Sequence, residues 1–122
     1  MDWWLILMIV LVAISAVFIT LGVIGLHRFP DVYTRLHAAT KATTFGSIFL
    51  AVAVMVFGVV RYLDAAPDNQ PAYITLIAHT ILALVFLLLT NPTGAHAIAR
   101  AARRSGIEPE QAVVDQWEEV RK

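Results

Sequence analysis

The chain has 122 residues, of which 59% are hydrophobic and 15% are charged, and its formal net charge is zero. This length allows one domain at most, and the charged share is well below the roughly 25% of an average soluble domain. Because the chain contains no cysteine, disulfides, thiolate metal sites and cysteine nucleophiles are excluded.

Three stretches of the chain contain no Asp, Glu, Lys or Arg, and they cover residues 3–26, 42–60 and 72–90. Each is long enough to cross a hydrocarbon core of about 30 Å as a helix that rises about 1.5 Å per residue. The first stretch lacks a preceding basic segment and is too long for the apolar core of a signal peptide, so we expect it to be retained. The sequence therefore predicts an all-α integral membrane protein with three transmembrane helices.

The connection between the first two stretches, residues 27–41, contains two histidines, a tyrosine, a proline, an acid and three bases. Pro30 and Asp31 are typical of a helix start, because proline is tolerated in the first turn and an acid there complements the helix dipole. Asp31 and Arg35 are four residues apart and can pair along one face. A plain basic anchor is the competing interpretation, but an anchor needs only the bases.

One face of the second stretch carries small or polar residues. Such a stripe lets helix backbones approach closely and form interhelical hydrogen bonds. We interpret it as packing among the chain's own helices, and docking on another subunit is also compatible with it. The residues are spaced alternately four and three apart: Thr40, Thr44, Ser47, Ala51, Val54 and Gly58.

The third stretch contains His79, which is the eighth of its nineteen residues and is therefore expected close to the membrane midplane. Thr75 lies one turn earlier on the same face. Ionisable residues within a membrane are costly and often functional, so His79 and Thr75 are candidates for an ion path. The competing interpretation is a structural histidine, because a neutral imidazole can be satisfied by one carbonyl or hydroxyl.

The run Asn91-Pro92-Thr93-Gly94 is expected to end the third span, since proline disfavours helical geometry in the residue before it. Residues 93–122 are then expected to form a cytoplasmic tail. Residues 95–104 are Ala-rich and basic, which favours a helix lying at the headgroup surface. Residues 107–122 are acidic and predict a short amphipathic helix, with apolar positions Val113, Trp117 and Val120.

The distribution of basic residues predicts the orientation. The positive-inside rule places loops rich in Lys and Arg in the cytoplasm. The N-terminal flank has no Lys or Arg, and the second connection has only Arg61 beside two acids. We therefore expect the N-terminus outside and the C-terminus inside. The basic residues that decide this are Arg28, Arg35 and Lys41 in the first connection and Arg100, Arg103 and Arg104 after the third span.

Residues 25–46 resemble the signature of the G subunits of the Mrp (also called Mnh or Pha) multisubunit Na⁺/H⁺ antiporters. In that family the pattern reads approximately R-x-P-D-x-Y-T-R-x-H-A-x-x-K, between the first and second of three spans. The resemblance covers roughly residues 3–92 and does not extend into the tail. The matching positions are Arg28, Pro30, Asp31, Tyr33, Thr34, Arg35, His37, Ala38 and Lys41.

The resemblance implies a non-catalytic membrane subunit of a complex that exchanges Na⁺ for H⁺, contributing to its assembly and to the ion pathway. The implied partners are the other subunits and membrane lipids in a bacterial cell membrane, with no cofactor, no metal and no nucleic acid. It also implies inter-subunit contacts on the cytoplasmic side. The residues expected to make them are Arg28, Pro30, Asp31, Tyr33, Arg35, His37 and Lys41.

Two alternatives remain open on the residues alone. The chain could be a free-standing regulator or adaptor that presents its basic connection and acidic tail to soluble partners. It could also be a small homo-oligomeric channel lined by the stripe at residues 40–58. The spans contain no carboxylate or ammonium, and the chain has no inverted repeat, phosphate-binding loop or nucleophile with an adjacent base. By itself it is therefore poorly equipped to exchange cations, and we do not expect an enzyme.

Overall fold

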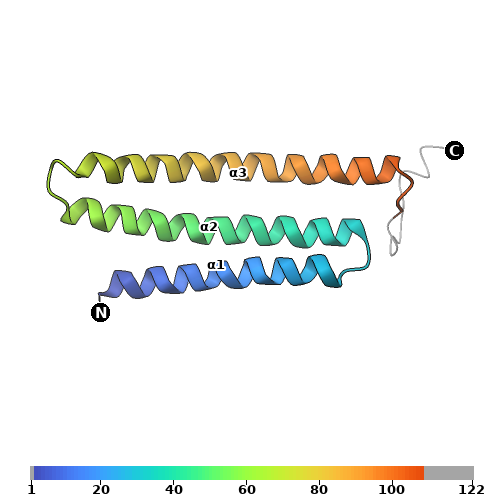
Figure 1. Ribbon diagram of the computed structural model, residues 1–122, viewed down its shortest axis with the longest axis horizontal. Helices are drawn as coiled ribbons and strands as arrows, with labels where there is room; N and C mark the ends of the chain where they lie inside the picture. The colour runs from blue at the N-terminus through green and yellow to red at the C-terminus, as the bar shows by residue number, and fades with distance from the viewer. Residues whose placement is uncertain (1, 109–122) are drawn as a thin grey trace.

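The computed structural model describes residues 2–108, which form three α-helices in one layer. The helices are α1 (Trp3–Arg28), α2 (Val32–Asp64) and α3 (Gln70–Arg104). They run antiparallel and side by side, with α2 in the middle (Figure 1). Over the described residues α2 contacts both neighbours, whereas α1 and α3 do not meet. The chain therefore has two helix interfaces and two unpartnered outer edges.

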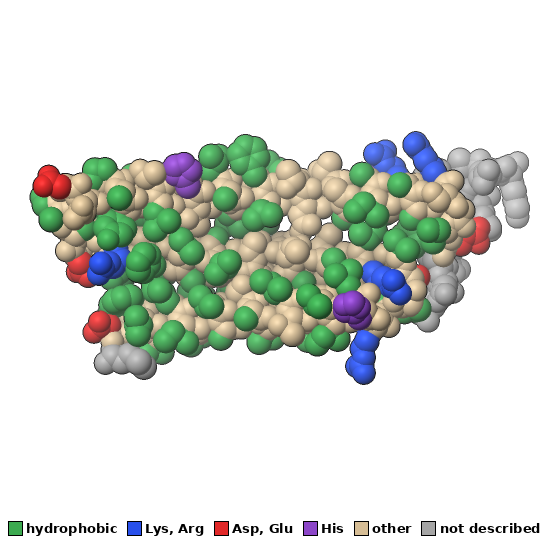
Figure 2. Space-filling model, in the orientation of Figure 1, with side chains coloured by type: hydrophobic (Ala, Val, Ile, Leu, Met, Phe, Trp, Pro, Cys, Tyr) green, Lys and Arg blue, Asp and Glu red, His purple; other side chains and the backbone are tan. Residues whose placement is uncertain are grey.

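The layer has almost no interior. The buried apolar side chains of the described residues are all alanines, whereas Val17 and Phe86 are each 58% exposed. Hydrophobic side chains occur along the whole length of the visible face (Figure 2). All three helices are long and apolar enough to cross a membrane, where lipid tails cover such surfaces. The prediction of an all-α protein with three spans is confirmed, and the orientation of its termini stays a prediction.

The interface between α1 and α2 combines glycine and alanine positions with a stack of three phenylalanine rings, in which Phe18 of α1 lies against Phe45 and Phe49 of α2. Gly22 lies against Ala42, where a Cβ added to the glycine would overlap the Cβ of Ala42. A Cβ added at Gly46 would lie 2.8 Å from Cγ1 of Ile19. The buried hydroxyl of Ser15 donates to the carbonyl oxygen of Gly46 at 2.7 Å. These contacts bring the two backbones close together, as in other membrane helix pairs.

The interface between α2 and α3 uses the opposite side of α2. Nδ2 of Asn91 donates to Oγ1 of Thr43 at 2.7 Å and to Oγ1 of Thr44 at 3.2 Å. Further along, Gly58 packs on Ile77, whose Cγ1 would lie 2.7 Å from an added Cβ. Residues between Thr44 and Gly58 at helical spacing share this side of α2. The stripe of small and polar residues read from the sequence, Thr40, Thr44, Ser47, Ala51, Val54 and Gly58, therefore lies along α3.

The third helix does not end at Asn91, and the expectation that it would is wrong. Helix α3 continues through Pro92 to Arg104, so residues 93–104 extend the helix along its axis (Figure 1). Proline removes one backbone hydrogen bond, and such a loss is tolerated in membrane helices where neighbouring groups support the backbone. Here the side chain of Asn91 is held by Thr43 and Thr44 of α2. Residues 95–104 therefore do not turn aside to form a separate surface helix, and the expected amphipathic helix falls largely on residues 109–122, outside the described residues.

Helices α2 and α3 are longer than a membrane core requires. At about 1.5 Å per residue, the 33 residues of α2 span about 50 Å, against about 30 Å of hydrocarbon. Residues 32–41 of α2 precede the charge-free stretch 42–60, and residues 91–104 of α3 follow the charge-free stretch 72–90. There the start of α2 packs beside the end of α3. We call residues 27–41 and 92–104 the basic end, since Lys and Arg side chains gather there (Figure 2).

Candidate functional site at the basic end

Asp31 caps the N-terminus of α2. Its Oδ1 accepts from the backbone N–H of Thr34 at 2.6 Å and from the Thr34 hydroxyl at 2.9 Å. Its side chain is buried, with 9% of the residue exposed. Such a cap contributes about 1 kcal/mol to a helix. Pro30 directly precedes this cap. The expected helix start at Pro30 and Asp31 is therefore present, and the signature forms the first turns of α2.

Arg35 stabilises the connection between α1 and α2 by a hydrogen bond to the backbone. Its Nε donates to the carbonyl oxygen of Phe29 at 2.7 Å, so the guanidinium reaches back over the short link to the end of α1. The side chain of Arg35 thus ties the two ends of the connection together.

Tyr33 joins the start of α2 to the end of α3. Its hydroxyl donates to the carbonyl oxygen of Ile107 at 2.9 Å. Ile107 is itself placed by the C-terminal cap of α3, in which Gly106 has a φ of 82°. The N–H groups of Gly106 and Ile107 bond to the carbonyl oxygens of Arg103 and Ala102, at 3.1 Å in both cases. This is a Schellman motif, which needs the positive φ that glycine accepts readily.

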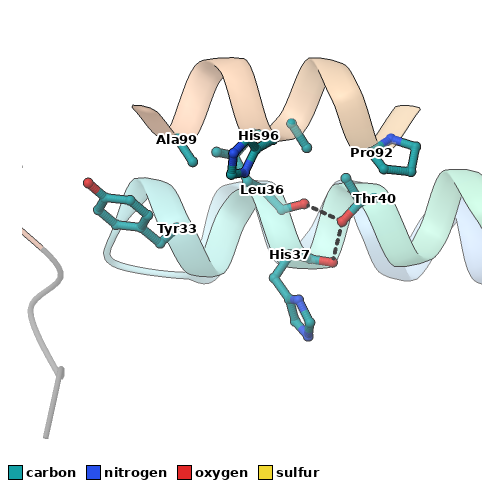
Figure 3. Close-up of a pocket in the computed structure, with 8 residues that line it drawn as sticks. Tyr33, Leu36, His37, Thr40, Pro92, His96 and Ala99 are labelled. Carbon is teal, nitrogen blue, oxygen red and sulfur yellow. Dashed lines mark hydrogen bonds between the residues drawn. The ribbon is translucent and has the colours of Figure 1, made fainter. Parts of the chain in front are cut away.

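A shallow groove of about 280 Å³ runs between α2 and α3 at this end. In Figure 3 His96 lies between the two helices near Leu36, whereas the ring of His37 points away from α3. The hydroxyl of Thr40 bonds within its own helix, to the carbonyl oxygens of Leu36 and His37. The two histidines are therefore not brought together. The groove is lined by Tyr33, Leu36, His37, Thr40, Pro92, Ala95, His96 and Ala99.

A second groove, of about 370 Å³, lies between α1 and α2 and is mainly apolar. Lys41 and His37 border it, and both side chains are exposed. Arg28 at the end of α1 is exposed as well. Within residues 2–108 the side chains of Arg28, His37 and Lys41 make no hydrogen bond, in contrast to those of Asp31, Tyr33 and Arg35. Over the same residues no group of three His, Cys, Asp or Glu side chains could hold a metal ion.

His79 and Thr75 lie far from the basic end and face away from the other two helices. The imidazole is exposed, and its Nδ1 lies 2.8 Å from the carbonyl oxygen of Thr75. The hydroxyl of Thr75 donates to Pro71 at 2.8 Å. From the contacts of Gly58 with Ile77 and of Thr44 with Asn91, the centre of residues 42–60 lies level with about residue 84 of α3. His79 is then about 7 Å nearer the α2–α3 connection than that level, and its place close to the membrane midplane stays a prediction.

Two features of the helix packing were not predicted from the sequence: the residues of α2 that face α1, and the hydrogen bonds of Asn91 to α2. The run Ala38, Ala42 and Gly46, spaced four apart, was a readable signal for the α1 interface, because small residues at this spacing allow close helix approach. Asn91 was read only as the residue before a proline. An amide at that depth beside threonines on the neighbouring helix is a possible interhelical donor, yet only the tertiary structure shows which helix it meets.

A single layer of three membrane-length helices, with a connection fixed by Asp31, Tyr33 and Arg35, is the structure of a small membrane protein. The family model of PhaG, MnhG and YufB, described as Na⁺/H⁺ antiporter subunits, matches residues 11–103. The chain belongs to this family of antiporter G subunits, which are membrane subunits of multisubunit Na⁺/H⁺ antiporters.

Individual relatives agree with this family. A UPF0091 protein of Pyrococcus horikoshii is 53% identical over 116 residues, which are 95% of this chain and 93% of that protein. The G subunit of the Na⁺/H⁺ antiporter of Alkalihalophilus pseudofirmus is 36% identical over 87 residues, covering 71% of this chain and 64% of the relative. The resemblance inferred from the signature is confirmed.

Two solved structures contain similar chains. One is the membrane-bound sulfane sulfur reductase, an archaeal respiratory membrane complex, with a TM-score of 0.75 and 37% identity over 96% of this chain and 99% of that chain. The other is the Mrp complex from Dietzia sp., with a TM-score of 0.64 and 27% identity over 94% and 98%. Both similar chains are parts of multisubunit membrane complexes.

Proposed function

We propose that this chain is a non-catalytic, helix-packing subunit of an Mrp-type antiporter, in which other subunits exchange Na⁺ for H⁺. The observation that carries the proposal is the single layer of helices. Within residues 2–108 its two interfaces bring the helix backbones close together at Gly22, Gly46 and Gly58, and α1 and α3 do not meet to enclose a passage. Its spans also hold no carboxylate or ammonium, the groups that proton-coupled transporters place within the membrane.

A second candidate is the same role within a respiratory complex. The TM-score of 0.75 to a chain of the sulfane sulfur reductase complex exceeds the 0.64 to a chain of the Mrp complex. The chain would then pack helices in a membrane arm that is coupled to redox subunits. The membrane that holds the chain would be bacterial under the first candidate, while the Pyrococcus relatives allow an archaeal membrane under the second.

Purification of the tagged chain from its host in mild detergent tests the proposal. We expect several large polytopic subunits to co-purify in fixed ratio, since the similar chains of solved structure are parts of multisubunit membrane complexes. Absorbance bands of redox metal centres in the same preparation would select the respiratory complex. Recovery only with a soluble partner, or only as a homo-oligomer, would instead support the regulator or the channel.

We propose that the basic end is an inter-subunit surface in which one group of residues holds the connection in shape and another contacts the neighbouring subunits. Asp31, Tyr33 and Arg35 bond within the chain and hold the connection in shape. Arg28, His37 and Lys41 are exposed, and their side chains make no hydrogen bond within residues 2–108. These three cationic or ionisable side chains therefore lie free to contact acidic groups of other subunits or lipid phosphates. Pro30 contributes by fixing the backbone before the cap.

Arg35→Ala should lower the fraction of assembled complex. The substitution removes the hydrogen bond from Nε to the carbonyl of Phe29, which we expect to cost about 1 kcal/mol, or about fivefold in the equilibrium between ordered and loosened connections. Native gels of membranes that express the variant measure the assembled fraction. Arg61→Ala is the matched control, because Arg61 is exposed at the opposite end of α2. Equal assembly of the two variants would contradict this role of Arg35.

An ion path that passes this chain is proposed to run outside it, at the boundary where the edge of α3 that carries His79 meets another subunit. His79 and Thr75 lie on that face and are exposed. Because the chain itself forms only one layer, the opposite wall of such a path would belong to another subunit. This proposal keeps His79 as the residue of the spans best placed to line or tune the path.

A further inference from the structure

His79 directs its imidazole away from the rest of the chain. Ile77 packs on Gly58 of α2, and two residues further along a helix the direction has turned by about 200°. His79 accordingly lies on the opposite side of α3 and is exposed. It lies within residues 72–90, which carry no charged residue. A polar group at this place needs a partner, because lipid tails offer no hydrogen bond.

The intrahelical contact of His79 determines which ring nitrogen carries the proton. Nδ1 lies 2.8 Å from the carbonyl oxygen of Thr75, which can only accept. Nδ1 is therefore the protonated nitrogen, and in the neutral ring Nε2 has a free lone pair. His79 thus presents a hydrogen-bond acceptor at the outer face of α3.

The other polar side chains on the outer faces are satisfied within their own helices. The hydroxyls of Thr75 and Thr90 donate to carbonyl oxygens four residues earlier, at 2.8 and 2.7 Å. On the outer face of α1 the hydroxyl of Thr20 donates to Ala16 at 2.7 Å. In residues 2–108 no hydrogen bond reaches Nε2 of His79. The outer edge of α3 therefore differs chemically from that of α1.

We propose that the outer face of α3 docks against a transmembrane helix of another subunit of the complex, and that this helix supplies a hydrogen-bond donor, a hydroxyl or an amine, to Nε2 of His79. Ala72 and Ala83, seven residues before and four after His79, flank it on the same face and leave room for a neighbouring helix. The outer face of α1, by contrast, contacts lipid.

A second copy of this chain does not supply the hydrogen-bond donor that Nε2 of His79 requires. In a symmetric pair of α3 helices each imidazole would face another Nε2 acceptor, and two acceptors do not bond. The inference rests on the proposed membership of a complex, and it adds which edge of the chain is the docking edge and what chemistry the neighbour brings.

Photo-crosslinking in the purified complex tests which edge is covered. Benzoyl-phenylalanine is placed at Phe86, two turns from His79 on the same face, or at Val17 on α1. The two native side chains are each 58% exposed. We expect Phe86 to crosslink to another subunit identified by mass spectrometry, and Val17 to crosslink to lipid. Crosslinks from Phe86 only to lipid, or to a second copy of the chain, would overturn the proposal even if the complex purifies intact.

Substitutions of His79 test the acceptor. Gln places an amide oxygen near the position of Nε2, whereas Asn reaches only the position of Nδ1. We expect His79→Leu and His79→Asn to weaken retention of the subunit about three- to thirtyfold, the range for one interhelical hydrogen bond in a membrane, and His79→Gln to restore it. Retention is measured as the subunit ratio after graded detergent washes. Equal behaviour of the Asn and Gln variants would overturn the proposed donor contact, and failure of every preparation to hold the complex would instead contradict the proposed function.

Discussion

Gly22→Ala should separate α1 from α2 and give the largest loss of stability among single-methyl changes in this chain. The added Cβ overlaps the Cβ of Ala42. Because the Cβ of Ala42 is fixed to the backbone of α2, it cannot move aside as the end of a flexible side chain could. Overpacking of this kind costs about 1–3 kcal/mol. Thermal unfolding of the purified protein in detergent, followed by gel filtration of the folded fraction, measures the loss.

Two further variants make the Gly22 experiment specific. At Gly94→Ala nothing lies within 4 Å of the added Cβ, so this change should be neutral or stabilise α3 by up to about 1 kcal/mol through helix propensity. Combining Gly22→Ala with Ala42→Gly leaves one methyl at the contact and should recover much of the stability. If Gly22→Ala is as stable as Gly94→Ala, close approach of α1 and α2 is not a requirement of the fold.

Asn91→Leu should loosen the end of α3 beyond Pro92. The substitution keeps the size of the side chain but removes the hydrogen bonds from Nδ2 to the hydroxyls of Thr43 and Thr44. Interhelical hydrogen bonds in membranes contribute about 0.6–2 kcal/mol each, and here they support the residue that precedes a proline. Hydrogen exchange measures the result, and we expect faster exchange in residues 95–104 with little change in residues 74–85.

Thr93→Val is the matched control for Asn91. Among residues 2–108 the hydroxyl of Thr93 bonds only to the carbonyl oxygen of Leu89 in its own helix, at 2.9 Å. Its loss should leave exchange at residues 95–104 nearly unchanged. Similar exchange in the two variants would show that the hydrogen bonds of Asn91 to α2 do not keep α3 helical through Pro92. Interactions within α3 itself would then account for its continuity.

The contacts of Gly22 and Asn91 could not be predicted from the sequence alone. Gly22 is a small residue within the first span, but which helix it meets depends on the order of helices in the layer. Asn91 and Pro92 together are typical of a helix end, and local preference favoured that interpretation. The interhelical hydrogen bonds of Asn91 outweigh the preference, and this is a contact between residues almost fifty positions apart.

His79 shows the same limit for the candidate site. Its position within residues 72–90 predicts a place close to the midplane, because the centre of a charge-free stretch is taken as the centre of the membrane. The register with α2 adds that the centre of residues 42–60 lies level with about residue 84, which is five residues further along α3 than His79. Its exposure was equally invisible, since a lone histidine on an apolar helix has no sequence pattern that separates an inward from an outward direction.

The sequence by itself determined the three spans, the helix start at Asp31 and the family. Spans follow from the length of chain without charges, which the bilayer thickness sets and which needs no tertiary information. The helix cap and the signature are local in the same way. Only the tertiary structure decided that the helices form one layer, that α3 runs unbroken to Arg104, and that Arg35 bonds to Phe29. It also decided that His79 faces outward, because each of these depends on which surfaces meet across the chain.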